Sequence, residues 1–197
     1  LRYEVFFADA DFAAKPHSIA SERWLQIPSG HNAEYVDALV ELTQHYKIDL
    51  LIPSVDEELL PIARNLRHFS CKVMLPPLHF VERHLDKLSS NQFLHQAGLP
   101  APQTVVADQG RLDFPCIVKP CRGRGSRNVG TVYSEAELQA QITLARQSPE
   151  DFVVQELVTG DEYTVMMAAD CNGKLRAIVP VLVERKRGIT LRATTTQ

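Results

Sequence analysis

A cluster of basic and glycine residues near the middle of the chain has the composition of an anion-binding loop. Lys119 is followed over the next eleven residues by three arginines and three glycines: Arg122, Gly123, Arg124, Gly125, Arg127 and Gly130. Glycine adopts positive φ angles and lets the backbone approach a ligand closely, and free N–H groups beside cations bind phosphates. The cluster therefore predicts a site for a polyphosphate, with a hairpin that has a solvated basic tip as the alternative.

The spacing of these residues differs from that of two common phosphate-binding motifs. A Walker A loop needs a lysine directly after its second glycine, whereas Thr131 follows Gly130 here. A dinucleotide fingerprint needs its glycines at the start of a helix, and Gly123 and Gly125 are followed by a strand-like run. In this chain the lysine precedes the loop, so neither motif explains it.

Two segments of strand-forming residues flank the loop. Residues 114–119 form an apolar run that ends in the lysine, and residues 129–133 are β-prone. Runs of this kind, bounded by glycine and proline, are typical of strands. We expect a strand, a flexible basic loop and a second strand, with Lys119 at the base of the loop.

The composition of the chain is that of a globular protein, with 197 residues of which 45% are hydrophobic and 23% charged. The net charge of −3 argues against a general nucleic-acid-binding surface, so the partner of the basic loop should be small. The four cysteines form no Cys-x-x-Cys pair and show no zinc-like spacing with the seven histidines. We interpret them as reduced residues of a cytoplasmic protein. No apolar run reaches about 18 residues, which predicts no membrane span.

The first 85 residues alternate between strand and helix patterns. Apolar runs at residues 3–8, 48–53 and 71–75 predict buried strands. Helical spacing over residues 33–46 and a capping box from Ser54 to Glu57 predict helices between these strands. Because strands that alternate with helices favour βαβ units, we expect an α/β domain with a parallel sheet.

A further helix is predicted over residues 86–97, and Gly98 ends it. Lys87 lies in the first turn of this helix, where a positive charge opposes the helix dipole. The position indicates either a nearby anion or a solvated lysine, and the sequence leaves both open.

The segment beyond the loop predicts mostly antiparallel structure. A capping box from Ser134 to Glu137 begins a helix, and strands are expected over residues 152–158 and 162–169. Asn172 and Gly173 then give a strong hairpin signal, so residues 175–183 should pair back on the preceding strand. This half of the chain is therefore α+β rather than parallel α/β.

Five short motifs occur in an order that is similar to one known family. They are Asp86-Lys87, residues 98–102, residues 114–120, the loop at residues 123–126 and the run of residues 154–165. In this order they resemble the ATP-grasp superfamily, in the style of its carbamoyl-phosphate synthase large-subunit-like members. The first 85 residues resemble the domain that precedes the grasp in that family, so the likeness covers nearly the whole chain.

The resemblance implies a phosphate site. Lys87 and Lys119 would contact the nucleotide phosphates, and Gly123, Gly125 and Ser126 would lie in the flexible loop that closes over them. These roles agree with the need of phosphates for cations and N–H groups.

The resemblance also implies an adenosine site on the strands that follow. Glu156 and Val158 would meet adenine mainly through backbone groups, and Glu162 would hold the ribose. An extended backbone offers the acceptor and the donor that adenine needs, and a carboxylate suits the ribose diol.

The activity implied by the resemblance is that of an ATP-dependent ligase. It would activate a carboxylate as an acyl phosphate for attack by an amine or a similar nucleophile, with no catalytic residue assigned. ATP and small carboxylate and amine substrates would be its partners, without nucleic acid or membrane, and a homo-oligomer stays open. A catalytically inactive nucleotide-binding regulatory module is the alternative.

The family's magnesium ligands are not found in this sequence. The family uses late carboxylates, usually a Glu followed two residues on by Asn, and nothing before Gln197 matches that pattern. We therefore expect the Mg²⁺ ligands beyond Gln197, and expect the isolated fragment to be inactive. The chain also starts within a strand-like segment without an initiator methionine, so an N-terminal segment is expected before Leu1.

The predicted organisation has two domains. Residues 1–85 would form a pre-ATP-grasp domain with a parallel sheet, partly Rossmann-like. Residues 86–197 would form a C-terminally incomplete ATP-grasp domain with antiparallel sheets, and its lid subdomain would extend over approximately residues 112–155.

Overall fold

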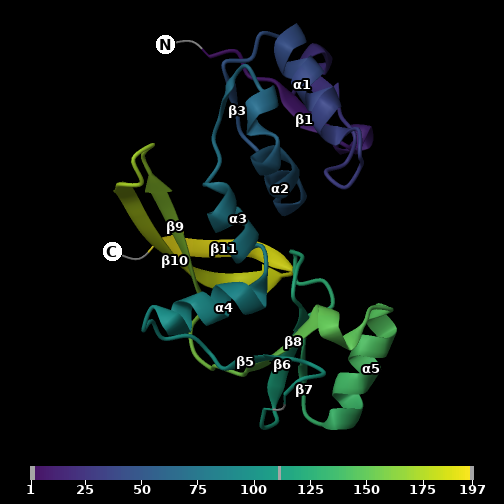
Figure 1. Cartoon of the computed structure of the whole chain (residues 1–197), viewed down its shortest axis with the longest axis vertical. Coiled ribbons are helices and arrows are strands. Elements are labelled where there is room, and N and C mark those ends of the chain that lie inside the picture. The colour runs from purple at the N-terminus through teal and green to yellow at the C-terminus, as the bar shows by residue number, and fades with distance from the viewer. Residues whose placement is uncertain (1–2, 111, 196–197) are drawn as a thin grey trace. The chain divides into compact units, whose positions relative to one another are not determined.

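The computed structural model describes residues 3–110 and 112–195, and the chain divides into two compact units, Leu1–Leu85 and Asp86–Gln197. The terminal residues Leu1 and Gln197, which bound the predicted domains, lie outside the described residues. Parallel strand pairs occur in the first unit and antiparallel sheets in the second, so the predicted fold class is confirmed. Figure 1 shows the helices and strands of the chain, coloured by residue number. Within the described residues, no helix is long and apolar enough to cross a membrane.

The described residues of the first unit form short strands and three α-helices. The strands are β1 (Phe7–Asp9), β2 (Trp24–Gln26), β3 (Leu50–Leu51) and β4 (Lys72–Val73), and the helices are α1 (Tyr35–His45), α2 (Asp56–Arg64) and α3 (Leu78–His84). Single 3-10 turns lie at Phe12–Ala14, Ser21–Arg23 and Leu66–His68. β1 pairs with β2 and β3 with β4, both in parallel, and β3, α2 and β4 form a βαβ unit.

The core of the first unit joins α1 and α2 to these strands. Tyr35 and Leu39 of α1 are four residues apart on one helix face, and they pack with Ile27 and Ile62. Residues spaced by four lie above one another on a helix, so one face of α1 forms this core.

Several details of the first unit were predicted wrongly. β1 and β3 are shorter than expected and are not buried strands: Phe7 is 43% and Leu50 47% exposed. Each belongs to a two-stranded sheet, which leaves much of its surface uncovered. The predicted capping box also fails, because α2 begins after Val55 and the N–H of Ser54 donates to the carboxylate of Glu58 at 3.1 Å.

Over residues 86–110 and 112–195, the second unit contains two antiparallel sheets, two α-helices and a 3-10 turn at Pro149–Asp151. Its helices are α4 (Lys87–Gln96) and α5 (Glu135–Ala145). The first sheet has the strand order β5-β8-β6-β7, with β5 (Thr104–Val106), β6 (Cys116–Pro120), β7 (Gly130–Val132) and β8 (Phe152–Glu156). The second has the order β11-β10-β9, with β9 (Tyr163–Ala169), β10 (Leu175–Arg187) and β11 (Ile189–Thr195).

Alternation along β6 and β8 gives the four-stranded sheet two different faces. Cys116 and Val118 of β6 and Phe152 and Val154 of β8 are buried in the core that α5 covers. Successive strand residues point to opposite faces, so Lys119 of β6 lies on the face away from α5. This alternation decides which side chains can form a site.

Three local predictions for the second unit are confirmed. β6 and β7 pair in antiparallel fashion across the basic loop, as the strand-loop-strand pattern predicted. β9 and β10 form the expected hairpin, in which Tyr163 pairs with Leu182. The helix α5 begins at the predicted cap, where Ser134 accepts the N–H of Glu137 at 3.3 Å.

Candidate functional site

Strand β6 places Lys119 at the base of the glycine loop, on the sheet face opposite α5. The ammonium group is half-buried, and it donates a hydrogen bond of 2.6 Å to the side-chain oxygen of Gln155 on β8. Burial, followed by the positive charge of Lys87, lowers the pKa of the Lys119 amine. The charge of Lys87 therefore adds to the effect of burial on Lys119.

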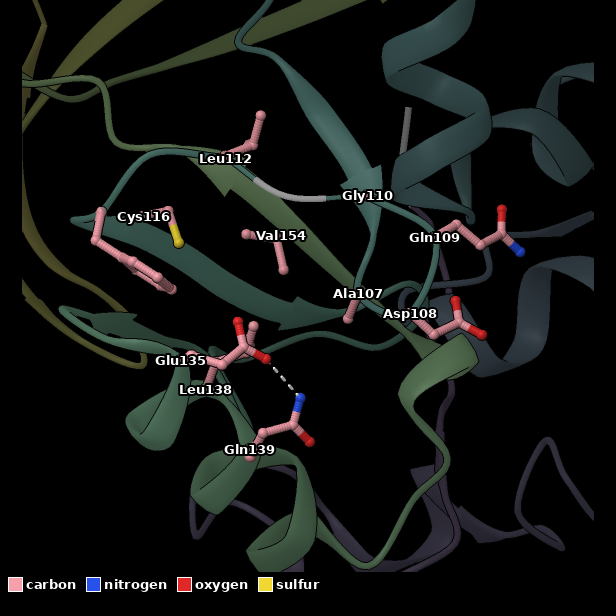
Figure 2. A pocket seen from close by; sticks show the side chains of 11 residues that line it. Ala107, Asp108, Gln109, Gly110, Leu112, Cys116, Glu135, Leu138, Gln139 and Val154 are labelled. Carbon is pink, nitrogen blue, oxygen red and sulfur yellow. Dashed lines mark hydrogen bonds between the residues drawn. The ribbon is translucent and has the colours of Figure 1, made fainter.

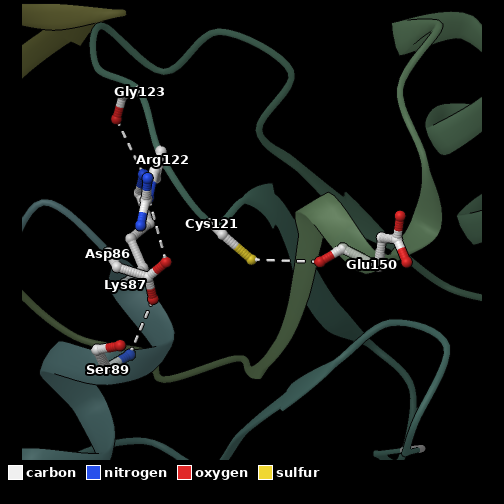
Figure 3. A network of polar contacts seen from close by, with 7 residues as sticks. All are labelled: Asp86, Lys87, Ser89, Cys121, Arg122, Gly123 and Glu150. Atoms are coloured by element: carbon white, nitrogen blue, oxygen red, sulfur yellow. Dashed lines mark hydrogen bonds and ion pairs between the residues drawn. The ribbon is translucent and has the colours of Figure 1, made fainter. Parts of the chain in front are cut away.

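The N-terminus of α4 brings Lys87 to the same loop (Figure 3). Asp86 caps this helix by accepting the N–H of Ser89 at 3.0 Å. The backbone N–H of Lys87 donates to the carbonyl oxygen of Cys121 at 2.8 Å, and its Nζ donates to the carbonyl oxygen of Gly123 at 2.9 Å. A lysine 32 positions before Lys119 in the sequence is thereby fixed beside the first residues of the loop.

The loop between β6 and β7 takes an unusual backbone path. Gly123 has φ 111° and Gly125 has φ 67°, and Ser126 and Asn128 are also left-handed, with φ 54° and 55°. An L side chain at the φ of Gly123 or Gly125 would be strained, which explains the two glycines. Turns that bring successive backbone N–H groups to one side form anion-binding concavities.

The tip of this loop contacts the turn between β10 and β11. The hydroxyl of Ser126 donates to the carbonyl oxygen of Gly188 at 2.9 Å. A Cβ atom added at Gly188 would lie 3.0 Å from the carbonyl oxygen of Gly125, so the two backbones are close together. The loop is therefore in contact with the second sheet as well as with α4.

The other residues predicted to bind a nucleotide lie at the end of β8 and the start of β9. Glu156 is the last residue of β8, and its carboxylate accepts the N–H of Gln103 at 3.1 Å. Val158 follows in the connecting segment and is 65% exposed. Glu162 precedes β9, and Lys186 of β10 donates to its carboxylate at 2.5 Å. All three residues therefore lie in or beside the connection between β8 and β9. The carboxylates of Glu156 and Glu162 each have a hydrogen-bond partner.

These features together fit an anionic ligand with several phosphates. Two lysines reach one loop from different elements, and four residues of the loop are left-handed, in a turn of the kind that can bind anions. Residues 85–187, slightly more than half of the chain, match the family model described as the ATP-grasp domain.

The chain belongs to the ATP-grasp family.

Curated relatives of this ATP-grasp chain include ligases and synthases. It is 32% identical over 108 residues to a D-alanine-D-alanine ligase from Corynebacterium aurimucosum, a match that covers 50% of this chain and 30% of the ligase. It is 30% identical over 123 residues to the carbamoyl phosphate synthase large chain of Mycobacterium tuberculosis, covering 58% of this chain and 11% of the synthase. The chain thus spans about a third or less of the length of these relatives.

A solved structure supports the ATP-grasp fold. N5-carboxyaminoimidazole ribonucleotide synthetase from Thermus thermophilus superposes with a TM-score of 0.65 at 18% sequence identity. The match covers 89% of this chain and 48% of the synthetase. At this identity the likeness extends to the fold alone.

Two polar residues close to Lys119 had no role in the sequence-based prediction. Gln155 is the hydrogen-bond partner of Lys119, and Thr104 of β5 is in turn the partner of Gln155. Strand alternation could have indicated Gln155, because side chains that follow one another along β8 point to opposite faces of the sheet. Gln155 is a polar residue that follows the buried Val154, so it lies on the face away from the core. Thr104 could not be found in this way, since its neighbour across the sheet was unknown.

The part of the chain that the structure describes does not form a metal site. Among residues 3–110 and 112–195, no group of three or more His, Cys, Asp or Glu residues is placed to hold a metal ion. We therefore assign no step to a metal.

A cavity of about 330 Å³ lies on the α5 side of the four-stranded sheet (Figure 2). Cys116 and Leu138 line it together with the polar Glu135 and Gln139, which are joined by a hydrogen bond of 3.0 Å. Cys116 and Leu138 belong to the core beneath α5, so the cavity opens on the face opposite Lys119. It is therefore separate from the lysine site.

Proposed function

We propose that this chain contributes the ATP-binding part of an ATP-dependent ligase. The enzyme would activate a carboxylate as an acyl phosphate, which an amine or a similar nucleophile then attacks. The convergence of Lys87 and Lys119 at the base of the glycine loop is the observation that carries this proposal. The relatives named as D-alanine-D-alanine ligase and carbamoyl phosphate synthase support the same class of chemistry.

The lysines and the loop would bind the phosphates of ATP. Phosphoryl transfer depends on positioning and on neutralising the charge of the transferred group. Lys87 and Lys119 supply two positive charges, and the backbone around Gly123, Gly125 and Ser126 supplies N–H groups. The lid subdomain at approximately residues 112–155 contains this loop.

The connection between β8 and β9 would bind the adenosine part. Backbone groups of Glu156 and Val158 would meet adenine, and Glu162 would hold the ribose, with Lys186 fixing its carboxylate. The family uses ATP, typically with Mg²⁺. Residues 1–85 would be the pre-ATP-grasp domain.

Calorimetric titration of the full-length protein with ATP and magnesium tests the proposal. Lys119→Ala should weaken ATP binding by about 10- to 100-fold, because a hydrogen bond to a charged group contributes about 1.5–3 kcal/mol. Lys174→Ala is the matched control, since Lys174 is exposed in the turn between β9 and β10. Equal affinity for wild type and Lys119→Ala would contradict the assignment.

A phosphate-release assay separates the ligase from a regulatory module. The full-length protein is incubated with ATP and panels of small carboxylates and amines. Release that requires one acid and one amine supports the ligase. ATP binding without release in any combination would instead favour the inactive nucleotide-binding module.

A further inference from the structure

We propose that Gln155 is a positioning residue: its side-chain amide, oriented by Thr104, holds Lys119 in place and leaves the lysine's positive charge available to the nucleotide. This inference rests on the proposed binding of ATP. It concerns a residue that does not itself have to touch the phosphates.

The orientation of the Gln155 amide follows from the polarity of its neighbours. An ammonium group has donors only, so the Gln155 atom 2.6 Å from the Nζ of Lys119 is its carbonyl oxygen. The NH₂ group then faces the hydroxyl oxygen of Thr104 at 2.7 Å. Since Thr104 accepts this bond, its own proton is free to donate to the carbonyl oxygen of Pro102 at 3.0 Å. The donor and the acceptor of each of these three hydrogen bonds are therefore fixed.

The chain of hydrogen bonds continues into the helix that carries the other lysine. The buried side chain of Asn91 in α4 donates to the same Pro102 carbonyl oxygen at 2.8 Å. Lys87 is the first residue of α4. These hydrogen bonds thus connect the helix of Lys87, through Thr104 and Gln155, to the ammonium group of Lys119.

A neutral acceptor suits this position better than a carboxylate. Lys119 is half-buried, and the charge acting on it from α4 is the positive charge of Lys87. β8 contributes the uncharged Gln155 and Val153 to its surroundings, β5 contributes Thr104, and β7 has no ionisable residue. A carbonyl oxygen stabilises the ammonium group without cancelling its charge, whereas a carboxylate would neutralise it before phosphate binds.

The pH dependence of ATP binding distinguishes positioning from a merely structural role. In wild type, ATP affinity should fall on the alkaline side as Lys119 loses its proton. Gln155→Glu should weaken binding at pH 7.5 by about tenfold, the loss of one charge-assisted contact, and move the alkaline fall to higher pH. Gln155→Met removes the acceptor and should move the fall to lower pH. A structural role alone would not move the two variants in opposite directions.

Thr104 provides a second, independent pair of variants. Thr104→Val keeps the shape of the side chain but removes both hydrogen bonds, so the amide of Gln155 loses its fixed orientation. We expect weaker ATP binding and an alkaline fall at lower pH, and Thr104→Ser should restore wild-type behaviour. Thermal denaturation identifies any variant that fails to fold. If the Gln155 variants do not fold, Thr104→Val and Thr104→Ser test the inference instead.

The possible outcomes separate this inference from the proposed function. Opposite displacements for Gln155→Glu and Gln155→Met, with rescue by Thr104→Ser, support it. A wild type that binds ATP, with folded variants whose alkaline fall stays in place or moves in one common direction, overturns this inference alone. A wild type that binds no ATP at any pH overturns the proposed function and this inference with it.

Discussion

The two faces of the four-stranded sheet in the second unit use the same strands in opposite ways. On the face toward α5, Val118 and Phe152 have no exposed surface and form the core. On the other face, one residue further along β6, Lys119 is held half-buried by Gln155. The first face gains stability from apolar burial, while the second keeps a cation where burial opposes its charge.

The difference shows how one short strand can serve folding and binding together. Full burial of a valine or phenylalanine side chain contributes about 1.5–3 kcal/mol. The lowered pKa of Lys119 shows that its charged form is disfavoured by its surroundings. Apolar burial on the α5 side thus offsets the cost of burying the charged Lys119 on the other side. Side chains with shifted pKa values are common at functional sites.

Phe152→Ala should have the largest effect on stability, and it should disturb only the core on the α5 side of the sheet. Removing this fully buried ring leaves a cavity, so the free energy of unfolding should fall by about 3–5 kcal/mol in urea denaturation. ATP affinity of the molecules that remain folded should be unchanged, because Phe152 points away from Lys119. Phe152→Leu is the control and should lose less stability. Weaker ATP binding by folded molecules would mean that the two faces are not independent.

Gly188→Ala should affect the Lys119 side of the sheet, because Gly188 contacts the glycine loop between β6 and β7. Its φ of 73° is left-handed, so alanine should cost about 1–2 kcal/mol of stability. The new Cβ would also press on the carbonyl oxygen of Gly125, and ATP binding should weaken in calorimetry.

Gly173→Ala is the matched control for this substitution. Gly173 has a similar φ of 76° but nothing within 4 Å of an added Cβ. It should lose a similar amount of stability with no change in ATP affinity. Equal ATP affinity for both variants would show that contact with Gly188 does not position the loop.

Asp86→Ala should have the smallest effect. It removes the N-cap of α4, which should lower stability by about 1 kcal/mol in thermal denaturation. Asp86→Asn keeps a good cap and loses only the charge that pairs with the exposed Arg122 at 3.4 Å, a pair worth less than about 1 kcal/mol. If the asparagine variant were as unstable as the alanine variant, the ion pair rather than the cap would be decisive.

Local patterns in the sequence predicted much of the second unit. The apolar run before Lys119 and the β-prone run after the loop gave β6 and β7 because both strands are specified by nearby residues. The Asn172–Gly173 turn likewise gave the β9–β10 hairpin. The first unit was less predictable, since the exposure of Phe7 and Leu50 depends on how many strands pair with theirs.

The candidate site was predictable in its types of residue but not in its contacts. Lys119 and the glycine loop stand out because cations and glycines are close together in the sequence. The meeting of Lys87 with Gly123, and of Thr104 with Gln155, joins residues far apart in the chain. Such contacts depend on strand order and register, which local patterns do not determine. The eight predicted nucleotide-binding residues themselves stay predictions.

The hydrogen bond from the Lys87 N–H to the Cys121 carbonyl oxygen has a consequence for evolution. It joins main-chain atoms, so any residue other than proline at position 87, and any residue at position 121, keeps the two bonding groups. The two lysine-bearing segments can therefore keep their spacing while the sequence between them drifts or gains residues in its loops. Lineages of this protein should vary in length between α4 and β6 far more than in the separation of the two lysines in space.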